Sequence, residues 1–237
     1  MIKELVEGSI IHWGKSMNDK MAIDKMAIKA ILAGLQTLFL TPMSVTTLTR
    51  SLPQRISDAA FRFLNPDIIR VSTVKVGPYS HLISPDPLTA GSDFASLLQR
   101  MGDIAPLASE EKAYLPWMVE LRKMVWGLGA WKMEIESPLG SKGPIPHGIC
   151  DLLVYGGPQH RGVIEVKVVT RGSVNIPRGR DLSQVGAYAR LVAGNGSFDR
   201  VFAAVAYVEL ETPAVRLFGV SNARELVTTT LELFKAA

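Results

Sequence analysis

Cysteine is almost missing from this sequence, which contains one cysteine, Cys150, in 237 residues. A single cysteine cannot form an intrachain disulfide, and it cannot supply a cysteine-rich zinc or iron–sulfur site. We therefore expect no iron–sulfur cluster. Because the same scarcity is typical of proteins in a reducing compartment, we expect a cytoplasmic protein.

Long uninterrupted apolar runs are missing as well. The longest hydrophobic stretch, residues 27–40, contains Lys29 and Gln36, and no charged segment followed by an apolar core and a small-residue cleavage site opens the chain. We therefore expect no membrane partner. Hydrophobic residues still make up 47% of the sequence, which is enough for a sizeable core in one large or two small domains.

Charged residues interrupt two apolar segments in the second half of the chain. The first segment, 147–155, carries Asp151, and the second, 163–169, carries Glu165 and Lys167. Both segments predict buried strands, and Glu165 and Lys167 share one face because side chains alternate along a strand. Turn-forming residues between the segments predict an antiparallel hairpin, which would bring Asp151 alongside Glu165.

This arrangement suits metal-dependent hydrolysis of a phosphodiester. Two carboxylates that face one point are ligands that Mg²⁺ prefers, and Asp151 and Glu165 would provide them, joined by the carbonyl of Val166. Lys167 would stabilise the negative charge that develops on the phosphate and the attacking water. The sequence leaves open whether this lysine stays charged or transfers protons.

A simpler interpretation treats Glu165 and Lys167 as a solvated pair on an exposed edge strand. Such a pair would contribute little to stability. Val163 and Val169 lie on the same face, however, and the whole segment is apolar, so the strand is expected to be buried on both sides. Unpaired charge is costly in that position, which favours the functional interpretation.

An aspartate, an E-x-K sequence and a Q-x-x-x-Y sequence follow one another: Asp151, Glu165-Val166-Lys167 and Gln184-Val185-Gly186-Ala187-Tyr188. In this order they resemble the PD-(D/E)XK nuclease superfamily, and the last of them resembles the helix of its RecB-like branch. The resemblance covers about residues 110–220. Cys150 stands where the family often has a proline before the aspartate.

The resemblance implies a restriction-endonuclease-like α/β fold and a nuclease that requires Mg²⁺ or Mn²⁺. It implies that Asp151 and Glu165 bind metal, that Lys167 is catalytic, and that Gln184 and Tyr188 belong to the site. Many members also place an acidic residue on the helix before the first core strand, and here Glu120 is the candidate.

Each of the three additional residues has a structural alternative. Gln184 has the spacing of a capping partner for an N-cap at Asp181. Tyr188 could be a core aromatic with a satisfied hydroxyl. Glu120 could be a solvated glutamate at the edge of its helix.

The segment after the hairpin turn is strongly basic. Residues 158–190 contain six arginines and lysines and two acidic residues, so their net charge of +4 equals that of the whole chain. We interpret residues 171–180 as a mobile basic loop that holds a phosphate backbone without reading bases. An ordinary solvated loop is the alternative, and an isolated histidine near a strand end, such as His147, is more often structural. The candidate nucleic-acid contacts are Arg161, Arg171, Arg178, Arg180 and His147.

Residues 1–107 predict a separate, mainly helical region. An apolar face predicts a helix over 18–40, and Pro53 begins a second helix. The alternating residues 69–76 predict a strand that turns back as a possible hairpin, and a loop over 84–92 leads to a short helix. This region could bind a protein partner or a second copy of the chain, and we expect the domain junction near residue 107.

Residues 108–237 predict a helix, three strands, a helix, two strands and a final helix. This order agrees with a mixed sheet flanked by helices, as in the nuclease core. We expect a nuclease acting on DNA. The alternatives are a nucleic-acid- or protein-binding module without activity, and a subunit active only in a larger complex. The sequence does not distinguish DNA from RNA, or cleavage at ends from internal cleavage.

Overall fold

A computed structural model describes residues 44–61, 69–77, 86–100, 107, 109–156, 160–194, 196, 198–220 and 223–236. Residues Met43–Ala237 form one compact unit. The helix expected over 18–40 lies outside the described residues. No helix among the described residues combines the length and apolar character needed to cross a membrane.

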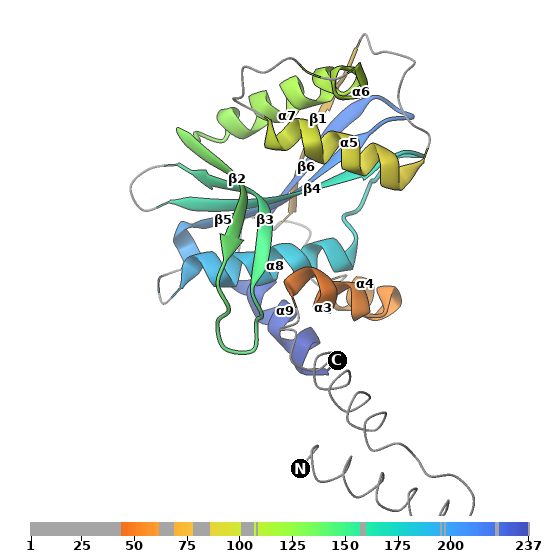
Figure 1. Cartoon of the computed structure of the whole chain (residues 1–237). Helices are drawn as coiled ribbons and strands as arrows, with labels where there is room; N and C mark the ends of the chain where they lie inside the picture. Colours follow the sequence, from red (N-terminus) through yellow and green to blue (C-terminus); the bar gives the residue numbers. More distant parts are fainter. Residues whose placement is uncertain are drawn as a thin grey trace, which may run out of the picture. The chain divides into compact units, whose positions relative to one another are not determined.

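A single mixed sheet organises this unit (Figure 1). Its six strands lie in the order β1-β6-β5-β4-β3-β2, and only β4 and β5 are parallel neighbours. The predicted mixed α/β class is therefore confirmed. The strands are β1 (Ile69–Lys75), β2 (Lys132–Leu139), β3 (Gly148–Tyr155), β4 (Arg161–Val169), β5 (Val201–Glu209) and β6 (Ala214–Val220).

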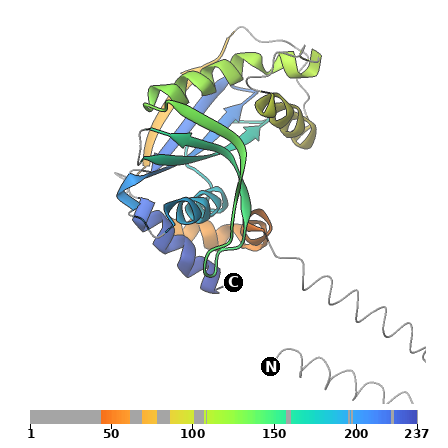
Figure 2. The ribbon, with the colours of Figure 1, turned by 60° about the vertical axis from the view of Figure 1, so that its left-hand side comes forward.

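Helices cover both faces of the sheet (Figure 2). Each face has its own apolar core, built from alternate side chains of the strands. One face packs against α5 (Pro87–Gln99), α6 (Ser109–Ala113) and α7 (Leu115–Gly127). The other packs against α3 (Val45–Ser51), α4 (Gln54–Phe61), α8 (Gly179–Ala193) and α9 (Ala223–Ala236). A short 3₁₀ turn, η2 (Phe198–Arg200), precedes β5.

Strand β4 lies at the centre and is buried on both sides. Val163 packs into one core and Ile164 into the other, and both are fully buried. The predicted hairpin is confirmed, because β3 and β4 pair antiparallel. Parallel pairing of β4 with β5 requires a crossover connection, and α8 provides it.

Helix α4 fixes the start of α8. The N–H of Gly179 donates to Asp58 Oδ1 at 2.7 Å, and Gln54 Nε2 donates to the same oxygen at 2.7 Å. A Cβ on Gly179 would lie 2.3 Å from the backbone of Ser57, so only glycine permits this approach. Because α8 begins at Gly179, the predicted N-cap at Asp181 is wrong, and Gln184 is not a capping residue.

The described part of the first hundred residues is built into the same unit as the later helices and strands. Strand β1 pairs along β6, and α3 and α4 pack against α8. The junction expected near residue 107 therefore lies inside one compact unit, since long-range pairing joins the two sides. The possible hairpin partner at 79–83 lies outside the described residues.

The loop expected over 84–92 is also shorter than predicted. Helix α5 begins at Pro87, because Asp86 accepts the N–H of Thr89 at 2.8 Å and proline suits the first helical turn.

Close packing of α8 on α9 gives a stability prediction. A Cβ on Gly186 would lie 2.1 Å from Thr230 Oγ1, whereas a Cβ on Gly91 of α5 would meet no described heavy atom within 4 Å. We expect Gly186→Ala to lower the free energy of unfolding by about 1–3 kcal/mol, because overpacking outweighs the helix propensity of alanine. Gly91→Ala, the matched control, should raise it by about 0.5–1 kcal/mol. Denaturant unfolding measures both, and equal effects would contradict this packing account.

Candidate active site

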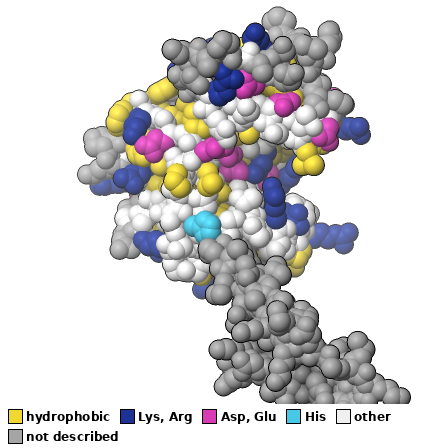
Figure 3. Space-filling model, viewed as in Figure 1, with side chains coloured by type: hydrophobic (Ala, Val, Ile, Leu, Met, Phe, Trp, Pro, Cys, Tyr) yellow, Lys and Arg dark blue, Asp and Glu magenta, His cyan; other side chains and the backbone are white. Residues whose placement is uncertain are grey.

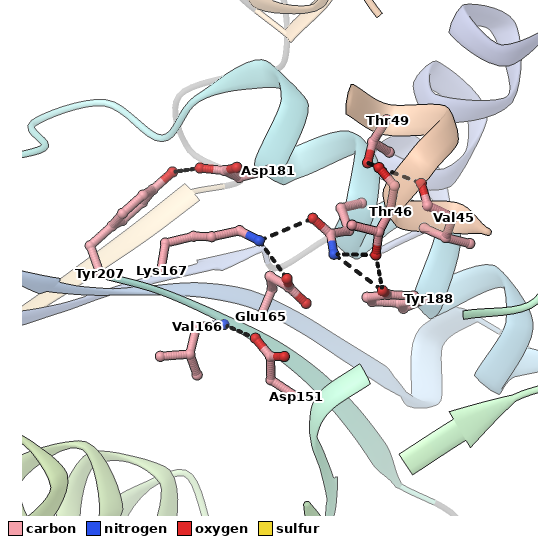
Figure 4. A network of polar contacts seen from close by, with 11 residues as sticks. Val45, Thr46, Thr49, Asp151, Glu165, Val166, Lys167, Asp181, Tyr188 and Tyr207 are labelled. Carbon is pink, nitrogen blue, oxygen red and sulfur yellow. Dashed lines mark hydrogen bonds and ion pairs between the residues drawn. The ribbon is translucent and has the colours of Figure 1, made fainter. Parts of the chain in front are cut away.

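Asp151 and Glu165 face each other across the hairpin. The register pairs Leu152 with Ile164, so Asp151 and Glu165 are the next facing positions and point to the same side of the sheet. Asp151 Oδ2 also accepts the backbone N–H of Val166 at 2.7 Å, as Figure 4 shows. The N–H and C=O of one strand residue point to the same side, so the Val166 carbonyl is directed towards Asp151 as well.

Lys167 joins Glu165 to helix α8. Its ammonium donates to Glu165 Oε1 at 2.5 Å and to Gln184 Oε1 at 3.1 Å. The side chain of Glu165 is only 4% exposed, so the alternative of a solvated pair on an edge strand is wrong.

Gln184 and Tyr188 lie one helical turn apart and continue the network. Gln184 Nε2 donates to the Tyr188 hydroxyl at 3.1 Å and to Thr46 Oγ1 at 3.4 Å. The Thr46 hydroxyl lies 3.4 Å from that of Tyr188. The ring of Tyr188 is fully buried, so this residue is a core aromatic whose hydroxyl faces the site.

Thr46 comes from α3, and nothing in the sequence near it indicated a role in the site. The N–H of Val45 donates to the carbonyl of His147 at 2.9 Å, which holds α3 against the start of β3. A Cβ on Gly148 would lie 2.5 Å from the Tyr188 ring, so glycine is required for this approach.

Burial and mutual repulsion shift both carboxyl groups. Burial, followed by the charge of Asp151, raises the pKa of Glu165 to about 8. Burial also raises the pKa of Asp151 above its ordinary value, although the N–H of Val166 opposes the shift. At neutral pH the metal-free pair therefore retains a proton, and a cation would have to displace it.

Lys167 remains a cation. Burial opposes its charged form, but the carboxylates of Glu165, Asp181 and Asp151 outweigh burial and hold the pKa of Lys167 above its ordinary value. Of the two roles that the sequence left open, this favours charge stabilisation over proton transfer.

The atoms present fit a hard divalent cation. Glu165 Oε2 is buried and has no hydrogen-bond partner among the described residues, although an orphaned carboxylate oxygen is costly. No group of three or more His, Cys, Asp and Glu side chains suited to a metal occurs in the described part of the chain. Asp151 and Glu165 would therefore hold the ion together with the Val166 carbonyl and water, as Mg²⁺ allows.

The structure brings Glu136, not Glu120, towards the two carboxylates. Glu120 lies on α7 and pairs with Lys123 at 2.8 Å. Glu136 lies on β2 between the residues that pair with Leu152 and Cys150, hence opposite Asp151, and its charge raises the pKa of Asp151. Glu136 has a φ of 48°, the one positive φ of a non-glycine residue in the described ranges. Gln99 Nε2 donates to its carboxylate at 2.5 Å.

Asp181 and Tyr207 border the site on the other side of Lys167 (Figure 4). The Tyr207 hydroxyl donates to Asp181 Oδ2 at 2.7 Å and accepts the N–H of Arg178 at 3.0 Å. Burial, and then the charge of Asp181, raises the pKa of Tyr207, so its hydroxyl stays protonated.

The basic loop is anchored rather than mobile. The N–H of Val174 donates to buried Glu209 at 2.6 Å, and the N–H of Gly172 donates to Glu211. Arg216 Nε donates to Glu209 at 2.9 Å and balances its charge. The loop therefore has a defined course between β4 and α8, which the expectation of mobility missed.

The five predicted nucleic-acid contacts do not form one cluster. Arg171 and Arg178 are exposed on the anchored loop, and His147 is exposed before β3. Arg180 is half-buried, and its Nε donates to the carbonyl of Leu52 at 2.7 Å. Arg161 begins β4, six residues before Lys167, so it lies about 20 Å along the strand from the site. On the face seen in Figure 3, acidic and basic side chains lie next to one another in the middle of the described body.

Comparison with known proteins adds little. No family model and no curated protein matches the chain. Among solved structures it is similar to one titled "Crystal structure of SSO0001", with 15% identity, coverage of 65% of this chain and 72% of that chain, and a TM-score of 0.30. At this TM-score the similarity carries no argument about fold or activity.

Proposed function

We propose that the protein is a nuclease dependent on Mg²⁺ or Mn²⁺ that hydrolyses phosphodiester bonds, most readily those of DNA, and that its sheet and helices form a restriction-endonuclease-like core. The observation that carries this proposal is the convergence of Asp151, Glu165 and Lys167 from two paired strands, with Glu165 Oε2 buried and without a partner. Gln184 and Tyr188, one turn apart on α8, would complete the site as the resemblance to a RecB-like Q-x-x-x-Y helix implies.

Each residue has a separate part in the proposed reaction. Asp151 and Glu165 would hold the cation, which supplies charge neutralisation of the phosphate and a more acidic water. Lys167 places its ammonium beside Glu165, where it stabilises negative charge that develops on the phosphate. Gln184 fixes the direction of the ammonium through its amide oxygen, and Tyr188 and Thr46 fix the amide in turn.

Nucleic acid is the substrate class that the surface charge supports. Exposed Arg171 and Arg178 lie on a loop whose backbone is joined to the site through Tyr207 and Asp181. Arginines at fixed positions contact phosphates without reading bases, so we expect little sequence preference. A cytoplasmic location agrees with such a substrate.

Incubation with labelled linear, circular and single-stranded DNA and with RNA, with and without Mn²⁺, tests the proposal. Cleavage that requires Mn²⁺ and disappears in Asp151→Ala is the expected result. Binding without cleavage under every condition would instead favour an inactive nucleic-acid-binding module. Activity that appears only in a larger assembly would identify the chain as a subunit.

The raised pKa of Glu165 predicts how metal affinity depends on pH. The proton is held below about pH 8 and must leave before the cation binds, so affinity should rise with pH. We expect the dissociation constant for Mn²⁺ to fall by up to about tenfold per pH unit between pH 6 and 8. Calorimetry in buffers of different ionisation enthalpy measures both the affinity and the released proton. Affinity that is constant over this range, without proton release, would contradict the assignment.

The raised pKa of Glu165 also predicts how the free energy of unfolding depends on pH. Since the folded protein binds this proton more tightly than the unfolded chain, the metal-free protein should lose stability as the pH rises from about 4.5 to about 8. Added Mn²⁺ should restore the loss.

A further inference from the structure

A second surface, formed by aromatic rings and cations, lies at the end of the β2–β3 pair away from the candidate active site. Trp131 is 62% exposed, whereas Trp117 is fully buried in the core. Its ring lies 6.4 Å from that of Tyr155, at an interplanar angle of 51°. The N–H of Trp131 donates to the carbonyl of Tyr155 at 2.9 Å, which fixes the tryptophan at the start of β2. An exposed tryptophan on a fixed backbone is a ready stacking surface.

Two cations accompany these rings. The ammonium of Lys132 lies 5.0 Å from the centre of the Tyr155 ring, and the guanidinium of Arg161 lies 5.9 Å from it. Cations near an aromatic face are stabilised by the ring. Lys132 is ion-paired with Glu134 at 2.6 Å, so Arg161 is the cation offered to an anionic ligand.

A cavity of about 430 Å³ lies at the same end of the sheet, and Arg161, whose guanidinium lies near the Tyr155 ring, is one of its lining residues. Ala130 and Gly156, the neighbours of Trp131 and Tyr155 in the chain, are part of its lining. Its polar side chains are those of His160, Arg161, Arg200 and Asp199, and Phe202 adds an aromatic wall. Two guanidiniums and an imidazole against one carboxylate make the cavity suited to a phosphate.

We propose that this surface binds single-stranded nucleic acid, with an unpaired base stacked on Trp131 and a neighbouring phosphate held by Arg161 and Arg200. Stacking on an aromatic ring requires an unpaired base, and rings combined with cations are the usual means of holding single strands. In a duplex the bases are already paired and stacked on one another, so none would be free to stack on Trp131.

One nucleic-acid strand could reach both this surface and the candidate active site. Tyr155 and Asp151 are four residues apart on β3 and point to the same side of the sheet, which separates them by about 13 Å, roughly four stacked nucleotides. The inference rests on the proposed function only where it links this surface to the candidate active site, because binding of a strand at Trp131 requires no cleavage.

Acidic residues on β2 between the two places are already occupied. Glu134 accepts from Lys132 at 2.6 Å and from the Tyr155 hydroxyl at 3.0 Å, and Glu136 accepts from Gln99. Their negative charge does not attract a phosphate, and Glu134 also neutralises Lys132. The affinity for phosphate should therefore depend on Arg161 and Arg200.

Binding to a variant that cannot cut tests the proposal. In full-length protein carrying Asp151→Asn, fluorescence anisotropy measures affinity for a labelled 12-nucleotide single-stranded DNA, an RNA of the same sequence, the matching duplex and an acidic peptide. Trp131→Ala should weaken binding of the single strand about tenfold. Arg161→Ala with Arg200→Ala should weaken it by a similar factor and reduce the slope of log affinity against log salt by about 2. The DNA and RNA arms show which single strand is preferred.

Matched variants separate a local effect from a general one. Trp126→Ala, which removes a tryptophan 37% exposed on α7, should leave affinity unchanged. Trp131→Phe should retain most of the affinity, because it keeps a ring, but should lose the quenching of tryptophan fluorescence by the bound strand. The thermal midpoint should be the same in the tryptophan variants, because the side chains of Trp131 and Trp126 are both partly exposed.

The proposal is overturned if Trp131→Ala binds as tightly as Trp126→Ala, if the duplex binds as tightly as the single strand, or if only the acidic peptide binds. Failure of the proposed nuclease activity would look different, because the unsubstituted protein would then cut no substrate while binding still depended on Trp131.

Discussion

Asp151→Asn and Glu165→Gln should each reduce metal-dependent cleavage by at least about 10³-fold while the protein remains folded. Both substitutions keep the size of the side chain and replace one carboxyl of the pair with an amide, which is a poor ligand for a hard cation. Because burial already disfavours the charged form of Asp151, metal-free Asp151→Asn should be at least as stable as the unsubstituted protein. Glu165→Gln also removes a counter-charge of Lys167, so it should gain less stability than Asp151→Asn.

The rate of cleavage at saturating Mn²⁺, together with the thermal midpoint of the metal-free protein, measures this expectation. Glu232→Gln, at an exposed residue of α9, is the matched control and should change neither quantity. If Asp151→Asn cuts at the unsubstituted rate, Asp151 is not a metal ligand. If both variants unfold, their loss of activity has a structural cause.

Lys167→Met should lower the maximal rate by about 10³-fold and leave Mn²⁺ binding within a few-fold of its original affinity. The methionine keeps an apolar stem of similar length in the buried strand but removes the cation that lies 2.5 Å from Glu165 Oε1. The effect is expected on the rate rather than on substrate affinity, since the charge that Lys167 stabilises develops during the reaction.

Separate measurement of the maximal rate, the substrate concentration at half-maximal rate and Mn²⁺ affinity distinguishes these effects. Lys123→Met, at a side chain 66% exposed on α7, is the control and should be neutral. A variant that loses metal binding in parallel with activity would show that Lys167 only organises the carboxylates.

Local patterns predicted much of this fold. Alternation along 163–169 gives the strand and places Glu165 and Lys167 on one face, and turn residues after Tyr155 give the hairpin. The i, i+4 spacing of Gln184 and Tyr188 places both on one side of α8. These features depend only on residues that are close in sequence, so local sequence patterns are enough to predict them.

The missed features depend on contacts between distant segments. Thr46 reaches the site because α3 packs at the start of β3, and Asp58 decides where α8 begins, across 121 residues of sequence. Glu136 lies opposite Asp151 through the register of β2 on β3, and its positive φ is a feature that a strand pattern does not predict. For Arg161, proximity in sequence was mistaken for proximity to the site, because six residues along a strand span about 20 Å.

Anomalous scattering from a crystal soaked in Mn²⁺ tests the central claim most directly. The account predicts an anomalous peak within coordination distance of both Asp151 and Glu165, and its loss in Asp151→Asn. A structure with Mn²⁺ bound elsewhere, or with no peak at the two carboxylates while Lys167 still bridges Glu165 and Gln184, would contradict it.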